Sequence, residues 1–472
     1  MRATGNYRNE AIAARRAFVY FCSRKTNYRN NMTHKFIPSL LLLGAAVLAP
    51  TAMQAQTQDE EVRSKSSRLQ VGGYGEATYE RRFYSDNVYR YSSPANYRND
   101  PSHGRFDLPH AVIYLGYDFG RGWKFATEIE FEHGGTGGAY EQEYEEAGEW
   151  ENERERGGEV ELEQFWIEKS FDRRLNLRMG HIVVPVGLLN AHHEPLEFFT
   201  VNRSEGEATI LPSTWHQTGV SLYGRAGRWR YELQALAGLD AMFFSRDNWI
   251  QGGAASVFEF ATANKYALAA RMDFNATPGL RMGLSGYYGH AFHNTSPHDL
   301  EGEDKDGKPK RYDGVRGEVA VVAFDLTYKT RNWRLAANAD YGYLGDAATI
   351  SQIKKNLTAN SSPYDKTFVG KNAYALGVEA GYDMLSPVRR AREHGHKLYA
   401  FGRLDYYDSY VPAAGMGDYR QTERKVVTAG LNYQPLPQIA VKAQYSHRFL
   451  RKGLNDEPSV AVGVVWQGFF TK

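Results

Sequence analysis

The basic residues with the most regular spacing in this chain follow short turn-like segments such as Phe-Gly-Arg-Gly-Trp-Lys and Gln-Pro-Leu-Pro-Gln. A ring of Lys and Arg around a water-filled opening raises the local anion concentration and disfavours cations. The alternative is that these bases are simply solvated or reach lipid headgroups. The predicted basic collar consists of Arg68, Lys124, Arg178, Arg230, Arg281, Arg334, Lys397 and Lys442.

A second set of candidate solute contacts lies in the long segment from Val184 to Trp215. Imidazole titrates close to neutrality, so His192 or His193 could make this segment sensitive to pH. The alternative is an ordinary polar surface pair. Glutamates outnumber the single arginine here, whereas a phosphate filter needs converging cations or N–H donors. The candidate contacts are His192, His193, Glu194, Arg203 and Glu205.

Signals for enzymatic or metal chemistry are weak. Ser213 with His216 is the best candidate for a hydrolase pair, and no acid that would orient the histidine can be named. The segments His-His-Glu-Pro and His-Gly-His lack the helical spacing of zinc sites. We therefore predict no enzyme activity, no metal site and no cofactor.

The N-terminal part reads as leader sequence. Residues 32–55 combine a short basic start, an apolar run and small residues before Gln56, which predicts a cleaved signal peptide. We interpret residues 1–31 as an extension upstream of the true start at Met32, with an unusually long basic leader as the alternative. Residues 56–67 would form a short N-terminal segment ahead of the folded part, 68–472.

Removal of this leader changes the charge balance. The whole chain carries 57 Lys and Arg against 55 Asp and Glu. Residues 1–55 hold eight of these bases and one acid, so the remainder carries 49 against 54 and is mildly acidic. This removes support for binding to nucleic acid. The single cysteine, Cys22, lies in the leader, so the exported part has no disulfide.

Short alternating runs recur through the rest of the chain and predict β-strands. The connections alternate between tight turns and long polar loops, which is typical of a transmembrane antiparallel β-barrel with short periplasmic turns and long extracellular loops. We expect sixteen strands, at 68–84, 104–119, 121–133, 158–171, 173–183, 216–226, 228–240, 264–276, 279–291, 315–329, 331–343, 371–384, 396–408, 422–433, 436–449 and 458–470.

The two faces of these strands differ in polarity. Val441 and Tyr445 alternate with Lys442 and Gln444, so one face suits lipid and the other water. The tryptophans Trp123, Trp229 and Trp333 each follow a short turn in phase with the apolar face, and they predict an interfacial aromatic girdle. The alternative is packing in an ordinary hairpin core.

The last strand resembles the C-terminal signal strand of bacterial outer-membrane proteins. Val462, Val464, Trp466 and Phe470 share one phase, although Thr471 and Lys472 follow the usual terminal Phe. The resemblance implies recognition by the barrel-assembly machinery and residence in the outer membrane of a Gram-negative bacterium, among lipid and lipopolysaccharide.

Residues 68–245 resemble the phosphate-selective porin O and P family, particularly its Bacteroidetes-like members. The similar stretches are RFDLPHAVIYLGYDFGRGWKFATEIEFE, FWIEKSFDRRLNLRMGHIVVPVGLLN and ILPSTWHQTGVSLYGRAGRWRYELQALAG. The resemblance implies a sixteen-stranded barrel, commonly a homotrimer, whose third loop folds into the lumen. Residues 184–215 would be that constriction loop.

These observations predict an outer-membrane porin for passive diffusion of small hydrophilic solutes or ions, with a preference for anions as a hypothesis. The acidic third loop does not favour phosphate specificity. The main alternative is a plugged barrel with an adhesive or structural role. A barrel enzyme, such as a lipase or acyltransferase built on Ser213 and His216, is a third possibility.

Overall fold

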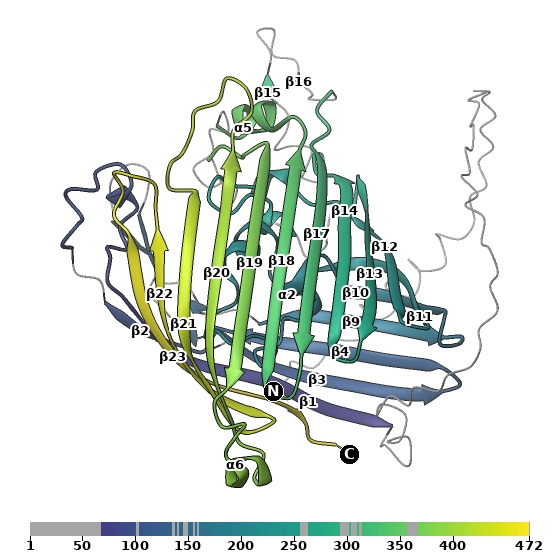
Figure 1. Cartoon of the computed structure of the whole chain (residues 1–472). Coiled ribbons are helices and arrows are strands. Elements are labelled where there is room, and N and C mark those ends of the chain that lie inside the picture. The colour runs from purple at the N-terminus through teal and green to yellow at the C-terminus, as the bar shows by residue number, and fades with distance from the viewer. Residues whose placement is uncertain are drawn as a thin grey trace, which may run out of the picture. The chain divides into compact units, whose positions relative to one another are not determined.

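The chain forms a closed antiparallel β-barrel of sixteen strands (Figure 1). The computed structural model describes residues 68–471 apart from 101–102, 135–136, 139–140, 145–149, 154–155, 158–159, 255–262, 293–301, 304–308, 311–313 and 356–366. The predicted leader, signal peptide and N-terminal segment lie outside the described residues. The predicted fold class is confirmed.

Each barrel strand pairs with the next along the barrel wall, and β23 closes the barrel against β1, from Gly72 opposite Phe469 to Arg82 opposite Ser459. The barrel strands are β1 (Leu69–Arg82), β3 (His110–Gly120), β4 (Trp123–Glu132), β9 (Val160–Ser170), β10 (Asn176–Val183), β11 (His216–Ala226), β12 (Trp229–Ala237), β13 (Tyr266–Thr277), β14 (Leu280–His290), β17 (Glu318–Lys329), β18 (Trp333–Leu344), β19 (Asn372–Asp383), β20 (Lys397–Val411), β21 (Glu423–Leu436), β22 (Ile439–Phe449) and β23 (Glu457–Phe469).

Successive side chains of a strand point to opposite faces of the sheet, which determines which residues lie outside and which lie inside the closed barrel. On β17, Val322 and Phe324 are exposed on the outside, whereas Asp325 is fully buried on the inside. The same parity holds on β22, where Val441 and Tyr445 face outward and Lys442 faces inward. Apolar residues therefore cover the outer surface and charged residues occupy the interior, the reverse of a soluble barrel.

The connections differ at the two ends of the barrel. At one end tight turns join strands, and the β3–β4 turn uses Gly122 at φ 78°, where a Cβ would lie 2.3 Å from the Ser170 carbonyl oxygen. The exception is the connection between β19 and β20, which contains the short helix α6 (Arg389–Glu393). The other end carries the long connections, including α5 (Ala347–Lys355) (Figure 1).

Minor elements decorate these long connections. They are η1 (Val88–Arg90), η2 (Ala241–Phe243), η3 (Gln251–Ala254) and the short strands β5 (Gly137–Gly138), β6 (Glu141–Tyr144), β7 (Trp150–Glu153), β8 (Arg156–Gly157), β15 (Gly302–Glu303) and β16 (Pro309–Lys310). Across the residues that the structure describes, none of the helices has the length and apolar character to cross a membrane.

One predicted strand, 104–119, is divided in the structure. Its first part is β2 (Gly104–Asp107), which pairs with the upper half of β1, and its second part is β3, which pairs with the lower half of β1. The break falls at Leu108 and Pro109. Proline has no N–H to donate to a strand ladder, which explains the interruption. The other fifteen strands lie at their predicted places within a few residues.

Candidate functional site

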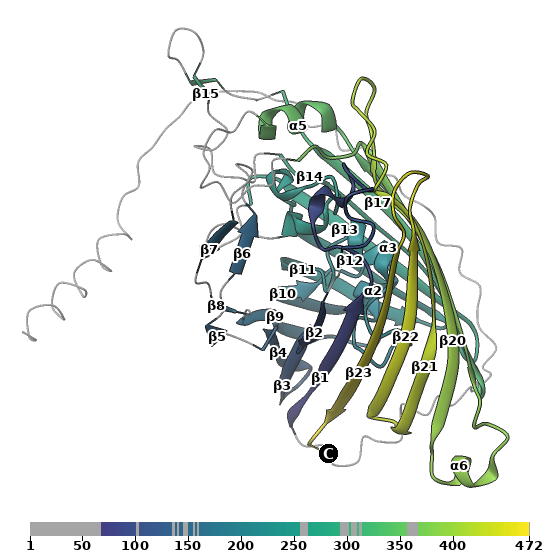
Figure 2. The ribbon, with the colours of Figure 1, turned by 90° about the vertical axis from the view of Figure 1, so that its left-hand side faces the viewer.

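The third long connection, residues 184–215, folds into the barrel, and we call it the lumen loop. It contains α2 (Leu188–Ala191) and α3 (Glu205–Ile210), which contact the inner wall at β17 and at β19 and β20, respectively (Figure 2). Ile210 and Trp215 are buried in a hydrophobic cluster with Trp249 and Phe292 from the neighbouring long connections. The loop is therefore packed as part of the fold.

A buried lysine holds the middle of the lumen loop. Lys442 of β22 is fully buried, and its ammonium donates to the carbonyl oxygens of Pro195 at 2.6 Å, Phe198 at 3.1 Å and Thr200 at 2.8 Å. Three acceptors match the three donors of an ammonium group. Lys442 is thus a loop anchor, and the prediction that it lines the pore as part of the collar is corrected.

Two further cations fasten the adjoining residues. Arg334 of β18 donates to the carbonyl oxygen of Glu197 at 2.7 Å and to that of Leu196 at 3.3 Å. Lys329 forms an ion pair with the Glu197 carboxylate at 2.7 Å. Burial alone would raise the pKa of Glu197, but Lys329 and Arg334 lower it below its usual value. The loop carboxylate therefore stays ionised at neutral pH.

The beginning of the lumen loop rests on an arginine cluster. Arg271 of β13 donates to the carbonyl oxygen of Gly187 at 3.0 Å and pairs with Asp325 at 2.8 Å. Arg281 reaches the same carboxylate at 2.9 Å and Asp273 at 3.2 Å. Shared carboxylates balance these two arginines, so the collar residue Arg281 carries little unpaired charge.

The end of the lumen loop bears Glu205 at the start of α3. The carboxylate accepts a hydrogen bond from Arg448 at 2.6 Å and one from the Tyr407 hydroxyl at 2.5 Å. Burial raises the pKa of Glu205, but Arg448 and Arg424 together bring it below its usual value. Nearby Arg403 pairs with Asp405 at 2.8 Å. Basic wall residues therefore pair with Glu205 here, as Lys329 does with Glu197.

A cavity of about 330 Å³ lies on one side of the loop, and it brings two sets of predicted residues together. The collar members Arg178, Arg230 and Arg281 line it with the loop residues His192 and His193. Acidic side chains share the same lining, namely Glu232 and Asp273. The lining is mixed in charge, and with Arg271 it holds four arginines.

A second interior cavity has a volume of about 180 Å³. Two more of the predicted loop residues, Arg203 and Glu205, line it. Its remaining lining includes Arg82, Arg403 and Arg448, which are not among the predicted site residues. Their inward phase on the strands was visible in the sequence. Their convergence on the loop was not, because it depends on where residues 184–215 fold.

The remaining collar members are dispersed. Arg68, Lys124 and Lys397 are exposed near the short-turn end of their strands. Arg178 is partly buried and forms an ion pair with Glu168 at 2.9 Å, and it also stacks over the Trp166 ring. The structure therefore separates the eight bases into exposed residues, residues paired with acids, and loop anchors.

The loop histidines differ in their surroundings. His192 lies among Arg281 and Arg271, and burial together with Arg281 lowers its pKa to about 3. It is therefore neutral near pH 7. His193 is buried, and Glu194 beside it is half-buried. Neither ring nitrogen of His193 has a hydrogen-bond partner.

The girdle tryptophans lie on the outside of the barrel. Trp123, Trp229 and Trp333 begin β4, β12 and β18, and their exposed fractions are 44%, 46% and 47%. Each is large, amphipathic and located immediately after a short turn. This is the position expected of side chains at a membrane interface.

The candidate hydrolase pair has other partners. The Ser213 hydroxyl accepts a hydrogen bond from Arg203 at 3.2 Å. His216 lies against His181, with 2.5 Å between their ring nitrogens, and 3.9 Å from the Glu161 carboxylate. These contacts give Ser213 and His216 separate roles in the wall and the loop.

Comparisons with known proteins give distant similarities. No family model matches the chain. An uncharacterised protein of Aquifex aeolicus (strain VF5) is 26% identical over 392 residues, which cover 80% of this chain and 75% of that protein.

Similar solved structures include the outer membrane channel DcaP of Acinetobacter baumannii, with a TM-score of 0.47, 12% identity and coverage of 85% of this chain and 97% of that one. A trimer form of OmpT, an outer membrane protein of Vibrio cholerae, has a TM-score of 0.45 with 10% identity, over 85% of this chain and 100% of that one. A mutant of the Rh. blastica porin has a TM-score of 0.41 with 10% identity and the same coverage.

Proposed function

We propose that this protein is an outer-membrane porin through which small hydrophilic solutes or ions diffuse passively. The observation that carries the proposal is the inverted polarity of the sixteen-stranded barrel. Apolar side chains such as Leu284 and Phe324 are 53% and 41% exposed on the outside, while Asp325 is buried inside. A surface of this kind suits lipid, and a charged interior suits water and solutes.

The charged cavities beside the lumen loop support a channel that discriminates between solutes by their charge. In the cavity of about 330 Å³, four arginines share the lining with two acidic residues and the two adjacent loop histidines. We propose a preference for anions, with Arg230 and the exposed Lys124 as its main contributors. Phosphate specificity is not part of the proposal, since the loop carries more acids than bases.

The remaining expectations complete the proposal. A signal peptide would be cleaved after Ala55, the C-terminal strand would be recognised by the barrel-assembly machinery, and three copies would assemble. The first point rests on the composition of residues 32–55 and the second on the phase of Val462, Val464, Trp466 and Phe470. The third is what the resemblance of residues 68–245 to the phosphate-selective porin O and P family implies. We propose no enzymatic activity.

Planar-bilayer recording tests the function directly. Folded protein is expected to form open channels, and a KCl gradient is expected to shift the reversal potential toward that of chloride. Lys124→Glu and Arg230→Glu should each reduce this shift. Arg389→Glu is the matched control, because Arg389 is 86% exposed on α6, outside the barrel strands.

The outcomes separate the two levels of the proposal. Open channels with cation preference would contradict the collar and retain the porin. Reproducible electrical silence from well-folded protein would contradict the porin and indicate a barrel closed by its own loop.

A further inference from the structure

Three ligand-type side chains meet at the place where the lumen loop touches the opposite wall. Glu128 of β4, Glu163 of β9 and His193 of the loop each offer one donor atom, and these atoms lie within 4.8 Å of one another. All three residues are buried, with exposed fractions of 1%, 0% and 7%. Three separate elements therefore supply one nitrogen and two oxygen ligands to a single point.

These donor atoms have no partners. Neither ring nitrogen of His193 makes a hydrogen bond, and one carboxylate oxygen each of Glu128 and Glu163 is equally unpaired. The closest approach between His193 and Glu128 is 4.0 Å, beyond hydrogen-bonding distance. In the described part of the chain, neither carboxylate pairs with a Lys or Arg.

Burial of these unpaired polar atoms destabilises the fold. A buried polar atom without a partner costs roughly 1–3 kcal/mol, and charged groups cost more. The remaining contacts do not balance the negative charge, since Glu163 accepts a hydrogen bond from the Tyr74 hydroxyl at 3.5 Å and lies against the Glu130 carboxylate, while Glu128 accepts one from the neutral Gln164. A divalent cation would satisfy the unpaired atoms together and balance the two negative charges.

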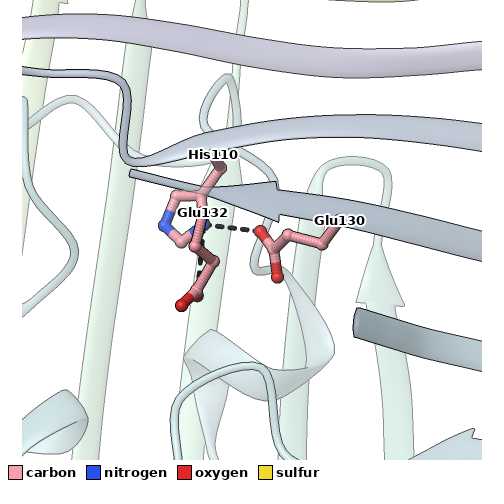
Figure 3. Close-up of side chains that lie close together, drawn as sticks. All are labelled: His110, Glu130 and Glu132. Carbon is pink, nitrogen blue, oxygen red and sulfur yellow. Dashed lines mark hydrogen bonds and ion pairs between the residues drawn. The ribbon is translucent and has the colours of Figure 1, made fainter. Parts of the chain in front are cut away.

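An adjacent cluster of the same residue types is the natural comparison (Figure 3). There the His110 ring nitrogen Nδ1 lies 2.5 Å from the Glu130 carboxylate, and Glu132 lies 3.9 Å away. His110 thus already has a strong partner. The contrast shows that histidine and glutamate on these strands can pair directly, and that the group at His193 does not.

We propose that Glu128, Glu163 and His193 bind a divalent transition-metal cation, of which Zn²⁺ is the representative. One imidazole with two carboxylates, and a fourth position left for water, is a ligand set that Zn²⁺ accepts. The bound cation would fasten the lumen loop to β4 and β9, two strands that carry none of its lysine and arginine anchors. The sequence predicted no metal site, because the ligands are far apart in the chain.

Calorimetric titration of the folded full chain in detergent with ZnCl₂ tests the site without reference to conductance. The expected result is one Zn²⁺ per chain. Glu163→Gln and His193→Gln should each weaken binding by at least about tenfold, a loss typical of an altered metal site. His447→Gln is the control, since this ring contacts Tyr445 and Asp456 instead, and it should leave the affinity unchanged. X-ray absorption of the bound zinc should show one imidazole among oxygen ligands.

Other outcomes would overturn the proposal. Absence of saturable binding, or equal affinity in all variants, would indicate that the carboxylates share a proton instead of a metal. A loss caused by His110→Gln but not by His193→Gln would move the metal to the adjacent cluster. Glu163→Gln preserves size and shape, so it decides the question even if His193→Gln disturbs folding.

Discussion

At the scale of single residues, the chemistry of this barrel is decided by which partner a charged side chain finds. Lys442 and Arg334 lie near the short-turn end of their strands, as the exposed Lys124 does, but backbone carbonyls of the lumen loop occupy their donors. The position of a basic residue on its strand therefore predicts whether its side chain points inward or outward. Whether that side chain is available to a solute depends on the lumen loop.

Replacing Lys442 by methionine is expected to release the lumen loop. The change leaves three buried carbonyls without their donor, at roughly 1–3 kcal/mol for each unpaired group. We expect a lower free energy of unfolding in urea and a larger single-channel conductance. Lys425→Met is the control, since Lys425 is exposed and its ammonium contacts only the Tyr406 ring in the described structure. Unchanged conductance with Lys442→Met would contradict the anchor.

His192 has a defined effect on stability. Its pKa of about 3 in the folded protein lies below the usual value of 6.5, because of burial and Arg281. The unfolded chain therefore takes up this proton first, so folding becomes less favourable as pH falls from about 6.5 toward 3. His192→Gln is expected to make that loss shallower, as measured by urea unfolding between pH 8 and pH 4. Identical pH profiles would contradict the shifted pKa.

At the scale of elements, the strands were predictable and their cross-lumen contacts were not. Alternation and turn signals located β17 and β22 with their faces, because strand parity is a local property of the sequence. The meeting of Arg448 with Glu205, or of His193 with Glu128, joins residues far apart in the chain. No spacing rule connects such residues.

The break between β2 and β3 has a local signal that the prediction overlooked. Pro109 interrupts an otherwise alternating run, and a proline inside a predicted central strand argues against continuous pairing. The contact of Lys442 with the lumen loop had no comparable signal. The alternation of its neighbours in sequence predicts only that its side chain points to the inside of the barrel.

The outward face of the strands predicts a depth-dependent response to charge. Leu284 faces Phe324 across β14 and β17 near the middle of both strands and is 53% exposed. Leu284→Arg is expected to destabilise the barrel folded in lipid vesicles by about 2–4 kcal/mol, the cost of an arginine at the bilayer midplane. Tyr266→Arg, at the loop end of β13, should cost about 0–1 kcal/mol. Equal costs at both positions, measured by urea titration, would contradict a lipid-facing surface.

At the scale of the whole molecule, acids and bases share the linings of both interior cavities, so the local arrangement of charge matters. Arg178, Arg281 and Arg403 each pair with at least one carboxylate. Under the proposed anion preference, selectivity would come from exposed bases near the short-turn end, such as Lys124.

Such residual charge should act over short distances only. The Debye length falls from about 10 Å at 0.1 M salt to about 3 Å at 1 M. We therefore expect anion preference, measured as reversal potential at a fixed salt ratio, to decline steeply as mean KCl rises from 0.1 M to 1 M. A constant preference would indicate selection by direct binding instead of by field.

The anchors of the lumen loop have a consequence for the order of events during folding. Arg271, Arg334, Arg403, Lys442 and Arg448 all follow the loop in the chain, and the Lys442 contact to Pro195 spans 247 residues. Contacts of such sequence separation form late, because a long chain closure precedes them. We therefore expect the loop to reach its final position only after β22 has arrived, so that docking of the loop follows formation of the barrel wall.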